Sequence, residues 1–190
     1  MRAFIAIALP PPQREAAAKL RDRIKETRIT ASWVKTENLH QTLRFLGDVT
    51  EAQVENLSGL LEQTCAETAP FIARLKSIGV FPNRRKPSVI WAGIEAHNAL
   101  LTLQDKVEQA ARRVGLAAET KKFLPHITLA RIKLRQDLGP FRAALDREVN
   151  FDGGEFTVDA LTLYQSVLKS GGAVYLALHV FNLARPTQQG

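Results

Sequence analysis

Two short stretches of this sequence share one pattern: HQTLRFL at residues 40–46 and HITLARI at residues 126–132. Each begins His-x-Thr-Leu, and its β-favouring residues predict a strand. Side chains two positions apart in a strand lie on the same face, about 6–7 Å from one another, so each stretch presents an imidazole beside a hydroxyl. Leu43 and Leu129 face the other side. The pattern therefore predicts two strands that are anchored in a core by leucine and offer His and Thr to the opposite face.

The segments around the two stretches are also alike, because each stretch follows strand and helix material and precedes a further helix. A possible capping box, Thr50 with Gln53, opens the helix after the first stretch. The repeat predicts two related halves whose polar faces lie across one cleft. Strand pairs joined by short loops favour an α+β fold over a doubly wound parallel sheet. We expect strands or extended segments at residues 1–9, 33–35, 39–46, 71–81, 88–94, 123–134, 155–167 and 173–183, and helices at 13–28, 50–68, 98–114 and 138–148.

Length and charge narrow the class of protein. With 190 residues, 45% of them apolar, residues 1–190 are expected to form a single domain with two lobes. The formal net charge of +7 is spread along the chain and favours an anionic partner, such as a nucleic acid or a nucleotide phosphate. The sign of the charge alone does not distinguish these from membrane headgroups.

Cysteine use and hydropathy indicate a reducing compartment. Cys65 is the single cysteine, so neither an internal disulfide nor a cysteine-rich metal site can form. The apolar opening is short and runs into three prolines at residues 10–12, which is unlike a secretory signal. No apolar run approaches the roughly 20 residues that cross a bilayer. We expect a soluble, cytoplasmic protein that binds no membrane.

The paired histidines predict acid–base chemistry. An imidazole has an unperturbed pKa near 6.5, so one histidine can act as a base and a second as an acid around neutral pH. Threonine hydroxyls can hold the non-bridging oxygens of a phosphate between them. Neither His40 nor His126 belongs to a metal-binding histidine pair, and no carboxylate cluster accompanies them. The alternative is that both are ordinary strand histidines, as we interpret His97 and His179, which lack a threonine two residues on.

Together with Arg2-Ala3-Phe4-Ile5-Ala6-Ile7 at the start and Leu163-Tyr164-Gln165-Ser166 near the end, the two stretches resemble the two-histidine (2H) phosphoesterase superfamily. The likeness spans nearly the whole chain and is strongest to the branch of RNA 2′,3′-cyclic phosphodiesterases, also called 2′-5′ RNA ligase-like. Trp33-Val34 and Phe123-Leu124-Pro125, which precede the two motifs, also fit that branch. The resemblance implies a bilobal, pseudo-two-fold arrangement of two antiparallel sheets facing a central cleft, with helices outside.

The resemblance also implies an activity and residue roles. A metal-independent and cofactor-independent hydrolase would open the 2′,3′-cyclic phosphate at an RNA end, with the 3′ oxygen leaving and a 2′-phosphomonoester remaining. By position, His40 corresponds to the proton donor and His126 to the proton acceptor. Thr42 and Thr128 would bind the phosphate. The chemistry of the residues alone establishes the pair but not which histidine has which role.

Further residues are candidate substrate contacts. Arg131 matches the arginine after the second motif and could donate two parallel hydrogen bonds to a phosphate. In an unbroken strand it would point away from His126, so this role requires a bulge, a strong twist or a strand end. Arg44 has the correct parity in its strand. Phe4 could stack on a base or be a buried strand residue; Tyr164 and the loop Arg84-Arg85-Lys86 could contact RNA.

Two alternatives remain open from the sequence. The chain could be a non-catalytic protein that holds RNA ends in the same cleft, although intact histidines in both motifs argue against this. It could also join RNA ends reversibly through a 2′-5′ linkage, since one pair of catalysts serves both directions. We expect a monomer; the physiological RNA and its base preference are not determined by these residues.

Overall fold

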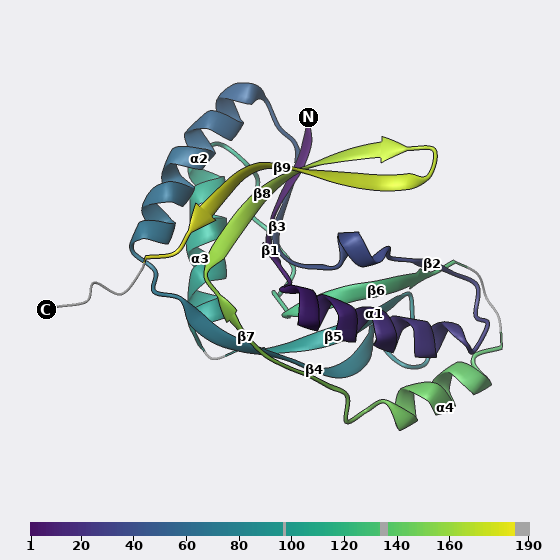
Figure 1. Ribbon diagram of the computed structural model, residues 1–190. Helices are drawn as coiled ribbons and strands as arrows, with labels where there is room; N and C mark the ends of the chain where they lie inside the picture. The colour runs from purple at the N-terminus through teal and green to yellow at the C-terminus, as the bar shows by residue number, and fades with distance from the viewer. Residues whose placement is uncertain (97, 134–136, 185–190) are drawn as a thin grey trace, which may run out of the picture.

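The computed structural model describes residues 1–96, 98–133 and 137–184. It alternates strands and helices as an α+β fold, with the order shown in Figure 1. The strands are β1 (Arg2–Ala8), β2 (Ala31–Trp33), β3 (His40–Asp48), β4 (Phe71–Phe81), β5 (Val89–Ala96), β6 (His126–Ile132), β7 (Asp152–Val158), β8 (Ala160–Lys169) and β9 (Gly172–Asn182). The helices are α1 (Pro11–Lys25), α2 (Glu51–Ala66), α3 (Asn98–Arg113) and α4 (Gly139–Arg147), and a 3₁₀ turn spans Thr36–Asn38.

The sheet is built from two antiparallel halves. Their strands follow the order β7-β4-β5-β6 and β3-β1-β8-β9, and β2 pairs with β6 at the side. The two halves are joined where β3 meets β6, through the single pair Gln41 and Ile127. The two sheets expected from the sequence are therefore the two halves of one continuous nine-stranded sheet.

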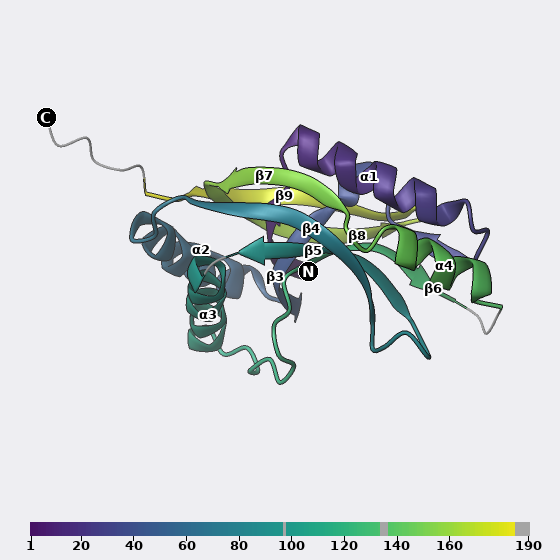
Figure 2. The ribbon, with the colours of Figure 1, turned by 90° about the horizontal axis from the view of Figure 1, so that it is seen from below.

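The halves are related by a pseudo-two-fold arrangement, as the sequence predicted. Reading outward from the junction, β3, β1, β8 and β9 correspond to β6, β5, β4 and β7. Helices α2 and α3 pack together beside the half formed by β3, β1, β8 and β9, whereas α1 and α4 lie against the half formed by β6, β5, β4 and β7 (Figure 1). The view from below shows these helix pairs on separate parts of the sheet (Figure 2).

The core forms between the sheet and the helices because the back of each motif strand is apolar. Leu43 and Leu129 are buried there, as predicted from the alternation in the strands. Helix α2 begins with the expected capping box: Thr50 Oγ1 accepts a hydrogen bond from the Gln53 backbone N–H, and the Gln53 side chain accepts one from the Thr50 backbone N–H.

One predicted element was wrong. We expected a single strand over residues 155–167, but the chain forms β7 and β8 with a break at Asp159. β7 pairs with β4 in one half of the sheet, whereas β8 pairs with β1 in the other. The run contains no glycine or proline at the break, and Asp159, a residue type that is depleted in strands, is the one local signal of the crossing. Residue 134, at the end of the expected segment 123–134, lies outside the described residues.

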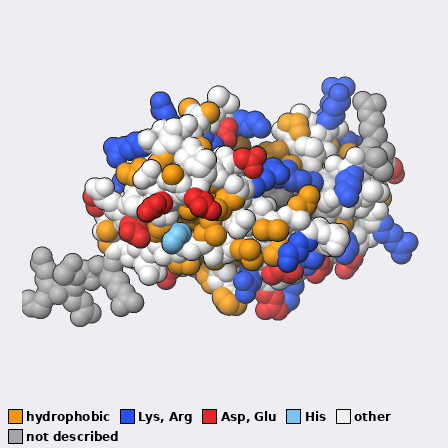
Figure 3. Space-filling model, turned by 90° about the horizontal axis from the view of Figure 1, so that it is seen from above, with side chains coloured by type: hydrophobic (Ala, Val, Ile, Leu, Met, Phe, Trp, Pro, Cys, Tyr) orange, Lys and Arg blue, Asp and Glu red, His pale blue; other side chains and the backbone are white. Residues whose placement is uncertain are grey.

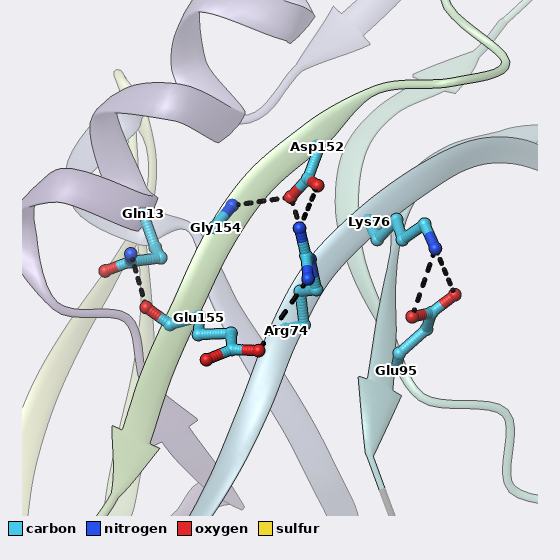
Figure 4. Close-up of polar contacts among 7 residues, drawn as sticks. All are labelled: Gln13, Arg74, Lys76, Glu95, Asp152, Gly154 and Glu155. Carbon is cyan, nitrogen blue, oxygen red and sulfur yellow. Dashed lines mark hydrogen bonds and ion pairs between the residues drawn. The ribbon is translucent and has the colours of Figure 1, made fainter.

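Charged side chains cross-link the strands on the open face of β7, β4 and β5 (Figure 4). Arg74 on β4 forms ion pairs with Asp152 and Glu155 of β7. Lys76 on the same strand pairs with Glu95 of β5, with Nζ and Oε1 3.2 Å apart. Gln13 of α1 donates a hydrogen bond to the Glu155 carbonyl at 2.9 Å, which fastens the helix to β7. These pairs join side chains of neighbouring strands and support the register of the sheet.

On the face seen from above, Lys and Arg side chains lie toward both ends of the molecule (Figure 3). Among the helices that the structure describes, none is long and apolar enough to cross a membrane.

Candidate active site

The two histidine motifs lie side by side at the junction of the two sheet halves. Gln41 pairs with Ile127, and each of these is the residue directly after a motif histidine. His40, Thr42, His126 and Thr128 consequently line one pocket with a volume of about 290 Å³. The tertiary fold thus brings together the four residues that the repeated sequence pattern singled out.

Each imidazole is oriented by a backbone carbonyl two residues before it. His40 Nδ1 lies 2.7 Å from the Asn38 carbonyl oxygen, and His126 Nδ1 lies 2.6 Å from that of Leu124. Because a carbonyl oxygen only accepts hydrogen bonds, Nδ1 carries the proton in both rings. Nε2 of each neutral ring is therefore free to take up a proton, and it can release that proton again once the ring is charged.

Aromatic side chains hold both imidazoles. The His40 ring stacks on Phe4 at a centroid distance of 4.8 Å and meets Tyr175 edge-on at 5.3 Å. The His126 ring meets Phe81 edge-on at 5.0 Å. Both rings are thereby held in fixed orientations at one pocket.

The same packing changes the acidity of the histidines. Burial is the largest cause that lowers the pKa of His40 below its ordinary 6.5; the carbonyl hydrogen bond opposes this, and the charge of His126 lowers the pKa further. Burial also lowers the pKa of His126 from 6.5, against its own carbonyl hydrogen bond and aided by the charge of Arg131. The two imidazoles are thus electrostatically coupled, and protonation of one disfavours protonation of the other.

Thr42 is positioned next to the proton-transfer atom of His40. Its Oγ1 lies 2.9 Å from His40 Nε2, so the hydroxyl and the imidazole nitrogen can contact neighbouring atoms of one bound group. A phosphate oxygen that accepts a hydrogen bond from this hydroxyl would lie beside the nitrogen.

Arg131 lies on the same side of β6 as the motif. The pairing of β5 with β6 shifts its register between Ile90 and Trp91, whose partners are Ala130 and Thr128, so Leu129 is an extra residue on β6. This irregularity reverses the parity that an unbroken strand would give. Arg131 therefore joins His126 and Thr128 in lining the pocket, which meets the condition that the sequence set for its phosphate role.

The prediction from strand parity was wrong for Arg44. A register shift at Leu43, between the pairs Ile5–Arg44 and Ala6–Thr42, turns Arg44 toward the back of the sheet. Arg44 is only 9% exposed, and its Nε lies 2.5 Å from Glu108 Oε2 of α3. It also donates hydrogen bonds to the Ala117 and Phe45 carbonyls and forms an ion pair with Glu119. Arg44 therefore fastens β3 to helix α3 and to the loop that follows it.

The remaining candidate contacts lie in different surroundings. Phe4 is 3% exposed, and its ring packs under His40 and against Tyr164 at 5.2 Å, which fits the buried-residue alternative better than an open stacking surface for a base. Arg84 of the basic loop extends to Asp146, 2.5 Å away. His179 is an exposed residue of β9 that packs against Phe181. His97 lies outside the described residues.

Sequence reasoning missed two residues that line the pocket, Phe45 and Tyr175. Phe45 follows His40 at the same offset at which Arg131 follows His126, and the matching register shifts put both on the pocket side. Its side chain is 57% exposed, which is unusual for a phenylalanine. The equal offset in the two motifs was the available signal. Tyr175, which closes over His40, could not be found this way because it comes from the distant strand β9.

Within residues 1–96, 98–133 and 137–184, no group of three or more His, Cys, Asp or Glu side chains is placed to hold a metal ion. The charged and polar side chains that line the pocket are two imidazoles, several hydroxyls, the Asn38 amide and the guanidinium groups of Arg2 and Arg131. Such a set can bind a phosphate and transfer protons on either side of it.

The fold and this two-histidine pocket define a phosphoesterase, and the sequence comparison gives the family. The family described as "LigT like Phosphoesterase" matches residues 7–91 and 94–175, and the chain belongs to it. The RNA 2′,3′-cyclic phosphodiesterase of Aquifex aeolicus is 32% identical over 96% of this chain and 97% of its own length. The enzyme of the same name from Thermus thermophilus is 35% identical over 96% of this chain and 90% of its own length.

Solved structures show the same architecture. TT0787 of Thermus thermophilus aligns with a TM-score of 0.82 and 31% identity, over 96% of this chain and 98% of that protein. LigT of Escherichia coli complexed with 3′-AMP aligns with a TM-score of 0.73 and 28% identity, over 97% and 98% of the two chains. The predicted α+β, two-histidine phosphoesterase fold is thereby confirmed.

Proposed function

We propose that this chain hydrolyses the 2′,3′-cyclic phosphate at RNA ends to a 2′-phosphomonoester, with His40 and His126 as its acid and base. The observation that carries the proposal is the matched pair of imidazoles in one pocket, each with Nδ1 fixed to a carbonyl so that Nε2 is the reactive atom. The names of the relatives from Aquifex aeolicus and Thermus thermophilus support the choice of substrate.

In the proposed reaction, His126 Nε2 removes a proton from water as the water oxygen bonds to phosphorus. The bond from phosphorus to the 3′ oxygen breaks on the far side, and His40 Nε2–H gives its proton to that oxygen. Attacking and leaving oxygens in a phosphoryl transfer lie roughly in line, so acid and base must stand on opposite sides of the phosphate. The assignment of donor and acceptor follows the resemblance to the family, because the carbonyl hydrogen bond at Nδ1 is the same in both imidazoles.

Three side chains would hold the phosphate during this step. The hydroxyls of Thr42 and Thr128 donate hydrogen bonds to non-bridging oxygens, and Arg131 adds a charge-assisted contact as negative charge develops. The hydrogen bond between Thr42 and His40 supports this arrangement, since it places the hydroxyl 2.9 Å from the acid nitrogen. Phe4 would keep the His40 ring in place and would not contact the substrate.

We further propose that residues 1–190 act as one two-lobed domain and that a monomer suffices. Each half of the sheet supplies one histidine and one threonine, so the site is formed within one chain.

The test is turnover of a 2′,3′-cyclic mononucleotide by the purified protein, with and without a chelator. Turnover that yields only the 2′-phosphate and persists with chelator is the expected result. No turnover would favour an RNA-end-binding protein, and loss of turnover on chelation would contradict metal independence. Reversible 2′-5′ joining is measured separately, by supplying an RNA with a 5′-hydroxyl and following the equilibrium.

A further inference from the structure

Three polar side chains of the two-histidine pocket have no part in the proposed reaction. Arg2 of β1, Ser166 of β8 and Tyr175 of β9 line this pocket. All three come from the half of the sheet that also carries His40. Arg2 and Ser166 belong to the stretches at the start and near the end of the chain that resemble the family, so the resemblance includes residues whose chemistry the proton transfers leave unused.

Strand pairing brings these three side chains together. The last pair between β1 and β8 is Ala3 with Gln165. Arg2 and Ser166 are the next residues outward on the two strands. Ser166 is in turn the cross-strand partner of Tyr175 on β9. A guanidinium and two hydroxyls therefore lie at one level on three neighbouring strands.

The three side chains lie on the His40 side of the pocket. Arg2 is two residues before Phe4, so the two side chains share a face of β1 and are about 6–7 Å apart. The Phe4 ring stacks on His40 at 4.8 Å. Strand β3, which carries His40, lies between β1 and the strand β6 that carries His126. A ligand that extends past His40 and away from His126 therefore reaches the strand of Arg2.

The charge of Arg2 is not used within the protein. Its side chain is exposed and has no ion-pair partner among residues 1–96, 98–133 and 137–184, although Asp48 is its cross-strand partner on β3. Burial raises the pKa of Tyr175 above its ordinary 10, against the positive charges of Arg131 and Arg2. The phenol thus keeps its proton at neutral pH and can donate a hydrogen bond.

A guanidinium beside two hydroxyls is a suitable set of ligands for a phosphate. Arginine can donate two parallel hydrogen bonds to phosphate oxygens, and hydroxyls can donate to the remaining oxygens. The reacting phosphate is already held by Thr42, Thr128 and Arg131 in the proposed function. The group at Arg2 therefore suits a second phosphate.

RNA supplies such a phosphate on the correct side. The ribose that carries the leaving 3′ oxygen lies on the side of the acid, His40, because attacking and leaving oxygens are in line. In an RNA strand the 5′ oxygen of that ribose is bonded to the preceding phosphodiester. This phosphodiester is separated from the reacting phosphate by the ribose alone, and it lies on the flank where Arg2 is placed.

We propose that Arg2, with the hydroxyls of Ser166 and Tyr175, binds the phosphodiester that precedes the terminal nucleotide. Arg2 is then a specificity-determining residue that favours the end of an RNA strand over a free nucleoside cyclic phosphate. This inference rests on the proposed function, because it takes the terminal ribose to lie beside His40. It concerns the His40 flank alone.

Three ligands test this subsite by direct calorimetric binding. Adenosine 2′-monophosphate carries the product phosphate alone. Adenosine 2′,5′-bisphosphate adds a phosphate monoester at the 5′ oxygen, and adenylyl-(3′→5′)-adenosine 2′-monophosphate adds the phosphodiester of a strand at the same oxygen. The variants are Arg2→Gln and the double variant Ser166→Ala/Tyr175→Phe, which keeps an aromatic ring against His40. Arg113→Gln, at the end of α3 and outside the pocket, removes the same charge as a control.

We expect the wild type to bind both two-phosphate ligands about 10- to 100-fold more tightly than adenosine 2′-monophosphate, the usual effect of hydrogen bonds to a charged group. Arg2→Gln should bring both ratios of dissociation constants close to one. The double variant should lower them about two- to tenfold, as expected for neutral hydrogen bonds. Arg113→Gln should keep the wild-type ratios. Added salt should reduce the ratios in the wild type and much less in Arg2→Gln.

Equal binding of the three ligands by the wild type would overturn the inference, and so would ratios that Arg2→Gln leaves unchanged. Equal weakening of all three ligands in Arg2→Gln would place Arg2 at the reacting phosphate instead. An advantage confined to the bisphosphate would exclude the phosphodiester of a strand as the occupant. Unchanged ratios in the double variant would remove the two hydroxyls from the subsite.

Two features keep this test decisive. Arg2 is exposed, so Arg2→Gln gives the answer even if the double variant does not fold. Binding is measured without turnover, so a protein that fails to hydrolyse cyclic phosphates would contradict the proposed function and still report on Arg2.

Discussion

Gln41 and Ile127 form the backbone pair that joins β3 to β6, and each directly follows a motif histidine. The pair therefore lies where the two halves of the sheet, which are related by the pseudo-two-fold arrangement, meet. Matching register shifts follow on both sides, at Leu43 and at Leu129. Each half of the sheet therefore supplies to one pocket an imidazole, a hydroxyl and the side chain five residues after the histidine, which is Phe45 in one half and Arg131 in the other.

Replacement of either motif histidine should remove most activity. His40→Ala and His126→Ala should each lower kcat for a 2′,3′-cyclic nucleotide about 10²- to 10⁴-fold, the usual contribution of one general acid or base. His179→Ala, on the exposed part of β9, is the matched control and should keep the wild-type rate. Circular dichroism and thermal melting establish folding. A folded variant of His40 or His126 with near-wild-type turnover would exclude that residue from the scheme.

Replacement of Arg131 should weaken catalysis without unfolding the protein. Arg131→Ala should lower kcat/KM about 10- to 100-fold, because a hydrogen bond to a charged group contributes about 1.5–3 kcal/mol. Arg131→Lys should recover part of the loss, since it restores a charge but not two parallel hydrogen bonds. Arg84→Ala, in the loop paired with Asp146, is the control. Steady-state kinetics that are unchanged in Arg131→Ala would place this residue outside phosphate binding.

The pH dependence should be bell-shaped, with its maximum on the acid side of 6.5. Burial lowers the pKa values of both His40 and His126 from 6.5. The active form carries one proton on the pair, so it is most abundant between two lowered values. As pH rises, His40 loses the proton it must donate; as pH falls, His126 gains a proton and can no longer act as base. A profile of kcat/KM that is flat from about pH 5 to 9 would contradict this scheme.

Arg44 should matter for stability more than for the chemical step. Arg44→Ala leaves Glu108 partly buried without its partner, and breaking a buried pair costs about 3–5 kcal/mol. Urea unfolding measures the loss in the free energy of unfolding. Arg74→Ala removes an exposed arginine that also has two acidic partners, and it should cost much less. Equal stability of the two variants would show that the Arg44 network does not anchor β3.

Gly79 should not tolerate a side chain. A Cβ at this position would overlap the indole ring of Trp91. Trp91 packs against Phe81, which in turn contacts the His126 ring. Gly79→Ala should therefore destabilise the protein by about 1–3 kcal/mol, the usual cost of overpacking, as measured by thermal and urea unfolding. Gly59→Ala, on α2 where a Cβ meets nothing within 4 Å, should show no such loss.

The sequence alone determined the repeated strand motif, because the alternation of polar and apolar side chains is a local property of a strand. It predicted the α+β class, most element positions, and His40, Thr42, His126 and Thr128 as one set. The family resemblance added the phosphate chemistry and the separate roles of the two histidines. The strand motif and the set of four residues needed only residue identity and spacing, whereas the phosphate chemistry and the separate roles rested on the resemblance.

Only the tertiary structure decided where Arg44, Phe45 and Arg131 point. Leu43 and Leu129 are each an extra residue with no partner on the neighbouring strand, β1 or β5, so the alternation of side chains between the two faces is reversed after them. The position of such an extra residue depends on the neighbouring strand and cannot be read from the sequence of the motif. The break at Asp159 and the contact of Tyr175 with His40 also result from pairing between strands that are distant in the sequence. Long-range strand pairing, which the local pattern does not encode, thus decides which side chains reach the two-histidine pocket.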